Sequence, residues 1–223
     1  MSGREAILRR VRGAMKVHAG DTGRAEAVQA RLANAPKGVI PARGQLARSE
    51  RVDLFCKMAA KLSASVERVS ASEAVPASVA SYLRERNLPA ALRMGADPRL
   101  VAMPWNQQGA LEVKSGASDG NDQVGLSHAS GAVAETGTLV MTSGGDNPTT
   151  INFLPEHHIV VVDAADIEGD LEAALERLRA RFGKGEMPRT VNLISGPSRS
   201  GDIEQKIILG AHGPRALHLI VVG

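Results

Sequence analysis

The sequence is poor in aromatic residues and in cysteine, and each shortage excludes a class of protein. The five aromatic residues are Phe55, Phe153, Phe182, Tyr82 and Trp105. They are too few to form the stacking platforms on which single-stranded nucleic acids bind. Cys56 is the single cysteine, so this chain alone builds neither a disulfide framework nor an all-cysteine iron–sulfur or zinc site. We therefore expect no cofactor in this chain.

Long hydrophobic runs are also missing. The first sixteen residues mix Arg4, Arg9, Arg10 and Arg12 with Glu5, which is not the pattern of a signal peptide or a membrane span. The expected location is the cytoplasm, with no membrane span. With 223 residues, of which 43% are hydrophobic, the chain is long enough to bury a core.

Charge is distributed unevenly along the chain. Residues 1–61 carry a formal charge of +8 and residues 62–223 a charge of −5. This asymmetry predicts a basic arm that packs on an acidic body or docks an acidic partner, and it favours no nucleic-acid partner. We place the boundary after residue 48, with a basic helical arm and connector in residues 1–48 and a larger domain in residues 49–223.

Three helices are predicted near the N-terminus. Ser2 and Glu5 have the spacing of a capping box before a one-sided apolar stripe. A second helix is expected from after Asp21 to about Ala35, and a third over Ser49–Leu62.

Beyond residue 62, short apolar runs alternate with helical patterns. Ile159–Val162 and Leu219–Val222 have no polar face, which is typical of strands that are covered on both sides. Apolar residues from Ile167 to Phe182 recur every three or four positions and predict a crossover helix. The expected fold is a three-layer α/β fold with a largely parallel sheet.

One polar stretch interrupts two strand-like runs. Glu135, Thr136, Gly137 and Thr138 lie between the runs, so the backbone must turn or bulge there and the carboxylate must lie at a strand end. Ligands bind at strand ends in open α/β sheets. Glu135 is therefore our candidate catalytic residue and the other three are candidate ligand-binding residues. The structural alternative is a bulge in which the glutamate and threonine side chains only hydrogen-bond to nearby backbone groups.

A second polar stretch follows the run Val191–Ile194, which we interpret as a buried strand. We expect a loop after it and then a helix that begins near Gly201, with Ser200 as its cap. Such a loop suits a phosphate or a carboxylate, although Asp202 and Glu204 count against an anion. The structural alternative is a capped loop in which Arg199 is paired with Glu135 or with another internal acid. The candidate ligand-binding residues here are Ser195, Gly196, Ser198, Arg199 and Ser200.

The histidines give no metal-binding pattern. His157 and His158 are adjacent at the start of a predicted strand and so point to opposite faces. No HExxH or HxH pair is present, and we predict no metal site.

Four segments together resemble one known family. They are Ala134–Val140, Leu154–Val162, Ser195–Glu204 and Leu209–Pro214. In this order, with the paired motifs AETGTL and SGPSR-x-x-DIE, they resemble the LUD-domain family over roughly residues 50–223. The resemblance implies a fold similar to the ribose-5-phosphate isomerase, glucosamine-6-phosphate deaminase and CoA-transferase group. It also implies a role in oxidising L-lactate to pyruvate together with iron–sulfur partner proteins.

Three functions are compatible with these patterns. The chain is expected to be a component of a lactate-oxidising complex that binds a small anionic ligand between residues 135–138 and 195–202. It could instead be a chemically inert scaffold for iron–sulfur proteins. The third alternative is an independent enzyme that acts on a phosphorylated or CoA-linked acid.

Overall fold

The computed structural model describes residues 2–18, 20–183, 185–203 and 206–223. The chain divides into two units, residues 1–39 and residues 40–223. The helices and strands are α1 (Gly3–Ala14), α2 (Thr22–Asn34), α3 (Arg48–Lys61), β1 (Ser65–Val69), α4 (Val75–Glu85), β2 (Ala91–Met94), α5 (Pro98–Val101), β3 (Glu112–Ser115), β4 (Val124–His128), β5 (Gly131–Val133), β6 (Thr138–Thr142), α6 (Thr149–Phe153), β7 (His157–Asp163), β8 (Ile167–Glu168), α7 (Leu171–Phe182), β9 (Val191–Ile194), β10 (Arg199–Ile203), β11 (Lys206–Leu209) and β12 (Ala216–Val222).

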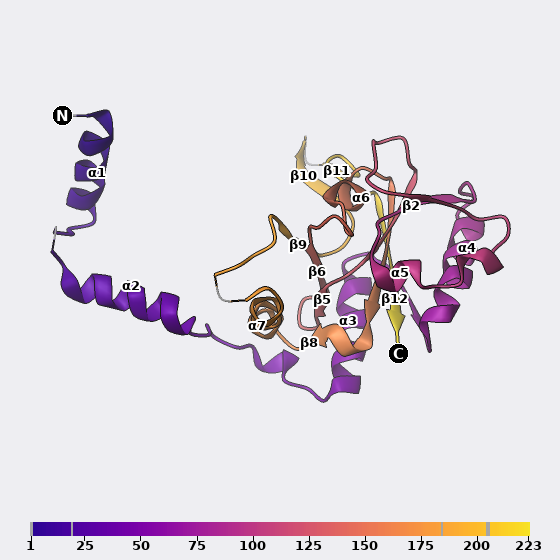
Figure 1. Ribbon diagram of the computed structural model, residues 1–223, viewed down its shortest axis with the longest axis horizontal. Helices are drawn as coiled ribbons and strands as arrows, with labels where there is room; N and C mark the ends of the chain where they lie inside the picture. Colours follow the sequence, from indigo (N-terminus) through magenta and orange to yellow (C-terminus); the bar gives the residue numbers. More distant parts are fainter. Residues whose placement is uncertain (1, 19, 184, 204–205) are drawn as a thin grey trace. The chain divides into compact units, whose positions relative to one another are not determined.

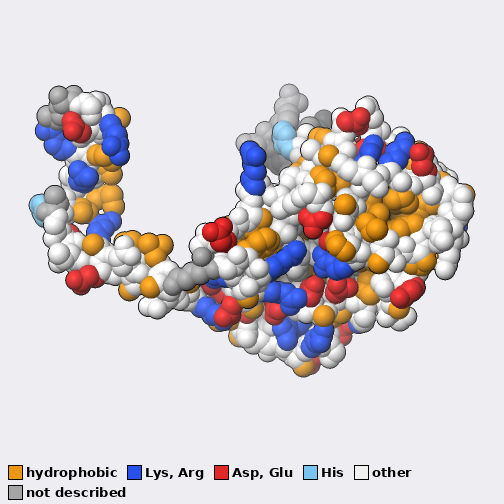
Figure 2. Space-filling view, in the orientation of Figure 1, with side chains coloured by type: hydrophobic (Ala, Val, Ile, Leu, Met, Phe, Trp, Pro, Cys, Tyr) orange, Lys and Arg blue, Asp and Glu red, His pale blue; other side chains and the backbone are white. Residues whose placement is uncertain are grey.

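The first unit contains two helices whose starts are fixed by side-chain caps. The backbone N–H of Glu5 donates to Ser2 Oγ, and the N–H of Ser2 donates to the Glu5 carboxylate, so the predicted capping box is present. Asp21 caps α2 by accepting from the N–H of Arg24. Neither helix has a buried residue. On α1, basic side chains lie beside a run of hydrophobic ones (Figure 2).

The second unit is built on a six-stranded sheet in the order β1-β12-β7-β4-β2-β3, in which every pair is parallel. Its central strands β7 and β12 are buried on both faces, as their unbroken apolar runs predict. Helices α4 and α5 cover one face (Figure 1). Helix α3 covers the other face together with a smaller sheet. The three-layer α/β expectation is confirmed.

The smaller sheet was not anticipated. Its order is β8-β5-β6-β9, and β6 runs antiparallel to both of its neighbours. The predicted crossover helix exists as α7, but it covers this small sheet rather than the parallel one. Ile167, expected in that helix, lies in β8, because Asp170 caps α7 by accepting from the N–H of Ala173.

Two further expectations near the C-terminal end are corrected. Val191–Ile194 is not a buried strand, since β9 lies at the edge of the small sheet and Leu193 is 48% exposed. The helix expected to begin near Gly201 is instead a hairpin of β10 and β11, in which Arg199 is the partner of Leu209. The β-branched residues Ile203, Ile207 and Ile208 favour strands over helix, and this preference prevails over the apparent cap at Ser200.

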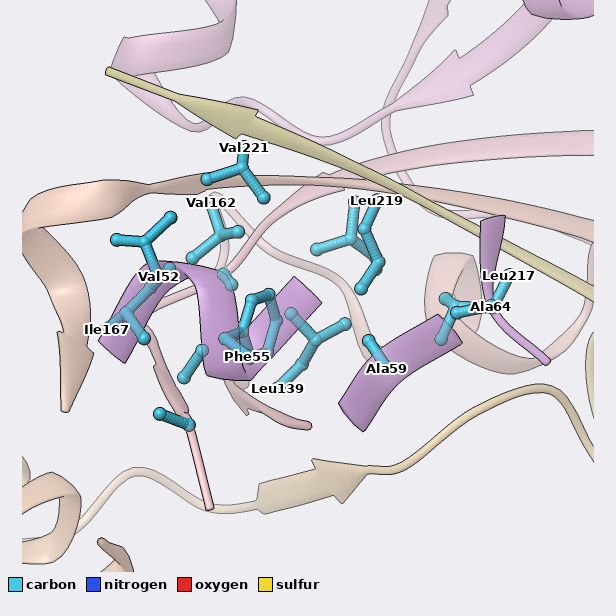
Figure 3. Close-up of a cluster of buried hydrophobic side chains, with 14 of the residues drawn as sticks. Val52, Phe55, Ala59, Ala64, Leu139, Val162, Ile167, Leu217, Leu219 and Val221 are labelled. Carbon is cyan, nitrogen blue, oxygen red and sulfur yellow. The ribbon is translucent and has the colours of Figure 1, made fainter. Parts of the chain in front are cut away.

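The core between the two sheets is organised by α3. Its buried residues are Val52, Phe55 and Ala59. Phe55 lies beside Leu139 of the small sheet, in one cluster with Leu219 of the parallel sheet (Figure 3). The helix therefore fills the space that separates the sheets. None of the helices in the described part of the chain is both long enough and apolar enough to cross a membrane.

Removing residues 1–39 tests the division into two units. We expect a chain that begins at residue 40 to keep a cooperative unfolding transition, because every residue of the hydrophobic core lies beyond it. A chain that begins at residue 48 also loses the hydrogen bond from Gln45 Nε2 to Asp170 Oδ2, 2.8 Å, and the ion pair of Arg43 with the buried Glu135. Its free energy of unfolding should fall by about 2–4 kcal/mol. Equal stability of the two shortened chains, measured by urea unfolding, would contradict this account.

Candidate functional site

Two glycine turns lie against the last turn of α3. Gly137, at φ +66°, has no room for a side chain, because a Cβ there would lie 2.5 Å from the backbone nitrogen of Ala59. Gly196, at φ +84°, approaches just as closely, and its Cβ would lie 2.5 Å from the carbonyl oxygen of Leu62. Only glycine combines this backbone conformation with such close packing. The two polar stretches identified in the sequence are thus held at one end of one helix.

A chain of hydroxyl groups links the two stretches. Thr136 Oγ1 and Thr138 Oγ1 are 2.7 Å apart, and Thr138 Oγ1 is 2.7 Å from Ser195 Oγ. Thr138 begins β6 and Ser195 follows β9, which are paired strands. The structure therefore brings Thr136, Thr138 and Ser195 together. Of these three only Ser195 lines the neighbouring cavity, and ligand binding by them stays a prediction.

Ser195, Gly196, Ser198 and Arg199 line a cavity of about 270 Å³. Its other walls come from the end of α6, the starts of β7 and β12, and the loop after β11. The lining residues are Asn152, Phe153, His158, Leu193, Ile194, Ser195, Gly196, Pro197, Ser198, Arg199, His212, Gly213, Pro214 and Leu217. The cavity lies at the amino-terminal edge of the parallel sheet, since His158 and Leu217 are each the second residue of their strands.

Two lining residues of the cavity, Asn152 and His158, belong to a buried hydrogen-bonded trio with Ser127. Ser127 Oγ donates to Asn152 Oδ1 (3.0 Å), and His158 Nε2 lies 3.1 Å from the same Oγ. Ser127 donates its one hydroxyl proton to Asn152, so His158 Nε2 must donate to Ser127 Oγ. In the neutral ring this leaves Nδ1 of His158 as the acceptor. Burial lowers the pKa of His158 to about 3. The ring is therefore neutral at pH 7, with one fixed tautomer.

Arg199 supplies the positive charge of the cavity. Its Nη2 donates to the carbonyl oxygen of Leu62 (3.4 Å) and to Ser63 Oγ. Among the described residues, no carboxylate lies within ion-pair distance of the guanidinium. The nearby Ser198 Oγ accepts from the N–H of His212 at 3.4 Å. Arg199 can thus bind an anion without first breaking an internal ion pair.

Glu135 lies outside this cavity. It lies two residues after the end of β5, near the strand end that the sequence predicted, and its side chain is 6% exposed. Its Oε2 is 3.5 Å from Nε of Arg43 and has no hydrogen-bond partner in the described part of the protein. The alternative pairing of Glu135 with Arg199 is wrong, since Arg43 takes that place. A catalytic role for Glu135 stays a prediction.

Several lining residues were not among the sequence candidates. Asn152, His158, His212, Gly213 and Pro214 all line the cavity. All of these except Asn152 lie in the segments that resemble the LUD-domain family. The sequence therefore marked these segments, but it assigned no function to these four residues. Asn152 has no such signal, because its place depends on how α6 packs on β4. Ser200 belongs to β10 and does not line the cavity.

The described residues contain no group of three or more His, Cys, Asp or Glu side chains that could hold a metal ion. His157 and His158 do point to opposite faces, as expected from their adjacency. His157 Nδ1 is 2.9 Å from the hydroxyl of Tyr82 on the α4 side, whereas His158 faces the cavity.

These features define an α/β protein with a parallel central sheet and a small polar cavity at its amino-terminal edge. The family model for the LUD domain matches residues 52–222. The chain belongs to the LUD-domain family.

Relatives and one solved structure agree with this assignment. Lactate utilization protein C of Shouchella clausii is 32% identical over 99 residues, which are 44% of this chain and 43% of that protein. The protein of the same name from Geobacillus thermodenitrificans is 33% identical over 119 residues, 53% of this chain and 49% of its own. The match thus spans about half the length of these relatives. The crystal structure of a DUF162 family protein from Deinococcus radiodurans has a TM-score of 0.60 at 23% identity and covers 80% of this chain and 99% of its own. It shows the same fold.

The neutral state of His158 makes the stability of the protein depend on pH. In the folded protein the pKa of His158 is about 3, whereas a histidine in the unfolded chain has a pKa of about 6.5. As the pH falls below 6.5, the unfolded chain therefore binds a proton at this histidine that the folded protein does not bind. The stabilisation is complete above pH 6.5 and decreases as the pH falls. From His158 we expect a loss of about 2 kcal/mol between pH 7 and pH 5.

The matched variants are His158→Gln and His212→Gln, compared by urea unfolding at the two pH values. Only the first should reduce the difference in unfolding free energy between pH 7 and pH 5. An unchanged pH dependence in His158→Gln would show that the buried ring is not the source.

Proposed function

We propose that this protein is a component of a lactate utilization system, in which L-lactate is oxidised to pyruvate, and that its cavity binds a small anionic ligand. Membership of the LUD-domain family and the names of the relatives support the system. The charge and hydroxyl groups of the cavity support the ligand class.

The observation that carries the ligand proposal is the unpaired guanidinium of Arg199 at a cavity edged by hydroxyl groups. A carboxylate or phosphate bound there makes a charge-assisted hydrogen bond, which is stronger than a bond between neutral groups. Ser198 lies beside it as a second donor. A cavity of about 270 Å³ suits a small acid rather than a nucleotide-sized cofactor.

The neutral imidazole of His158 favours a hydroxy acid within that class. With Nε2 bound to Ser127, the ring offers Nδ1 as an acceptor, and a ligand hydroxyl is a matching donor. A 2-hydroxy carboxylate carries both groups on adjacent carbons. L-lactate is the smallest chiral acid of this kind, and pyruvate differs from it by the absence of that donor.

The oxidation of L-lactate needs an electron acceptor, and we assign this role to iron–sulfur partner proteins. The exposed helices α1 and α2 supply a surface for such a partner. Ile7 and Val11 on α1 and Met15 directly after it are 63, 46 and 53% exposed, and the same segment carries Arg9 and Arg12. This surface equally favours the alternative of a chemically inert scaffold, in which the cavity binds nothing.

Ligand-induced stabilisation distinguishes the two. L-lactate, pyruvate and inorganic phosphate are added separately to the full chain, and the melting temperature is recorded. A ligand at 100 times its Kd should stabilise the protein by about 2.7 kcal/mol. Arg199→Gln should abolish this stabilisation, and Arg189→Gln, an exposed arginine outside the cavity, should keep it.

Either of two results would contradict the proposed anion site. If none of the three anions stabilises the parent chain, or if Arg199→Gln responds as the parent does, the cavity is not an anion site. The scaffold alternative is then favoured.

A further inference from the structure

The order of the parallel strands reverses between β2 and β4. From β2 the chain moves outward to β3, whereas β4, β7 and β12 follow each other in the opposite direction across the sheet. Where the strand order reverses, the connections leave the carboxyl ends of neighbouring strands in opposite directions and open a crevice. Here the crevice must lie between the residues that follow Met94 and those that follow His128.

A second cavity occupies this position. It has a volume of about 600 Å³ and is lined by Asp97, Pro98, Arg99, Ser130, Asp146, Asp166, Arg177, Leu178 and Arg181. Red and blue side chains gather over the region between α5 and α7 (Figure 2). It shares no residue with the cavity of Arg199. The two lie at opposite edges of the sheet, since His158 and Asp163 are at the two ends of β7, roughly 16 Å apart along the strand.

Most of the charges in this cavity are already paired. Arg99 donates through Nε and Nη2 to both oxygens of Asp97, at 3.0 and 2.8 Å. Arg177 donates to Asp166 and, at 3.3 Å, to Glu168. Such pairs give a rigid wall, because breaking one leaves an unpaired charge in a half-buried place.

Arg181 and Asp146 are the exceptions. Within the described ranges, neither has an oppositely charged side chain within ion-pair distance. Arg181 is nevertheless held in place, since its guanidinium lies 5.3 Å from the ring centre of Phe182 and Nη1 donates to Ser130 Oγ at 3.4 Å. The cavity thus offers one free cation and one free anion.

A pair of hydrogen-bond acceptors lies next to the cavity. His128 Nδ1 is 2.9 Å from the carbonyl oxygen of Ala129 and must donate to it, which leaves Nε2 as an acceptor. That Nε2 is 3.5 Å from Oδ2 of Asp163. Burial, and then the charge of Arg99, lower the pKa of His128, so two acceptors face each other. Oδ2 of Asp163 is also 3.8 Å from Nη1 of Arg99, and a donor group from a ligand would add to this contact beside the two acceptors.

We propose that this crevice binds a free α-amino acid as the zwitterion. The ligand carboxylate binds Arg181 and Ser130, and its ammonium group faces Asp146 and the His128–Asp163 pair. A zwitterion fits better than a simple acid, because the three guanidiniums that line the cavity are matched by its three carboxylates, and Asp163 and Glu168 beside them add further negative charge. A monoanion leaves an uncompensated charge there. The volume has room for a side chain beyond that of alanine.

The test uses three acids with the same three-carbon skeleton. L-alanine carries an ammonium group on the carbon next to the carboxylate, L-lactate carries a hydroxyl group there, and propionate carries neither. Binding to the full chain is followed by amide chemical shifts, with L-glutamate, L-lysine and L-phenylalanine as larger probes. We expect L-alanine or a larger amino acid to shift the amides of Ser130, Asp146 and Arg181, with a Kd at least about tenfold lower than that of propionate.

Variants locate the binding. Arg181→Gln and Asp146→Asn should each weaken amino-acid binding about tenfold. Arg179→Gln, on the same helix but outside the cavity, should leave the Kd within about twofold of the parent value. Arg199→Gln should also leave it unchanged, which separates this proposal from the anion site at the other edge.

Three results would overturn the proposal. They are no shift with any of the four amino acids, an affinity for propionate equal to that for the amino acid that binds most tightly, and amino-acid binding that is lost in Arg199→Gln but kept in Arg181→Gln.

Discussion

The close packing of two turns on the last turn of α3 is the constraint on which the first cavity depends. Helix α3 is fixed by its own buried face, since Val52, Phe55 and Ala59 lie between the two sheets. Burial contributes roughly 1.5–3 kcal/mol for each large side chain. With the helix fixed, Gly137 and Gly196 pack against its end so closely that neither position has room for a Cβ. That arrangement places the hydroxyls of Thr138 and Ser195 in contact and aims the residues after Ser195 at the cavity.

Charge pairing then decides which arginines can bind a ligand. Arg99 and Arg177 are neutralised by neighbouring aspartates and serve as walls. Arg199 and Arg181 are held by neutral groups instead, a serine hydroxyl in each case and, for Arg199, also a backbone carbonyl. Their positive charge is therefore available at the two opposite edges of the parallel sheet. Buried His158 adds a neutral acceptor at one edge and His128 at the other.

The sequence predicts the elements better than it predicts their partners. The apolar runs of β7 and β12 require burial on both faces, so a parallel sheet could be predicted from them. The smaller sheet could not, because nothing local to β5 or β9 indicates which strand each will join. The prediction of a helix cap at Ser200 was wrong because a serine two residues before an acidic residue, here Asp202, also occurs in a strand of a hairpin. The contact of Arg181 with Ser130 and the trio of Ser127, Asn152 and His158 join residues distant in sequence, and no local periodicity predicts such contacts.

Hydrogen–deuterium exchange of Gly196→Ala tests the role of α3 most directly, with Gly145→Ala as the control because a Cβ at Gly145 meets nothing within 4 Å. If the glycine contact with Leu62 holds the site together, exchange should rise in residues 195–199 and also in residues 59–63 and 136–139. Strand β7 should stay protected in both variants. An increase confined to residues 195–199 would contradict the account, because the two turns would then be positioned independently of α3.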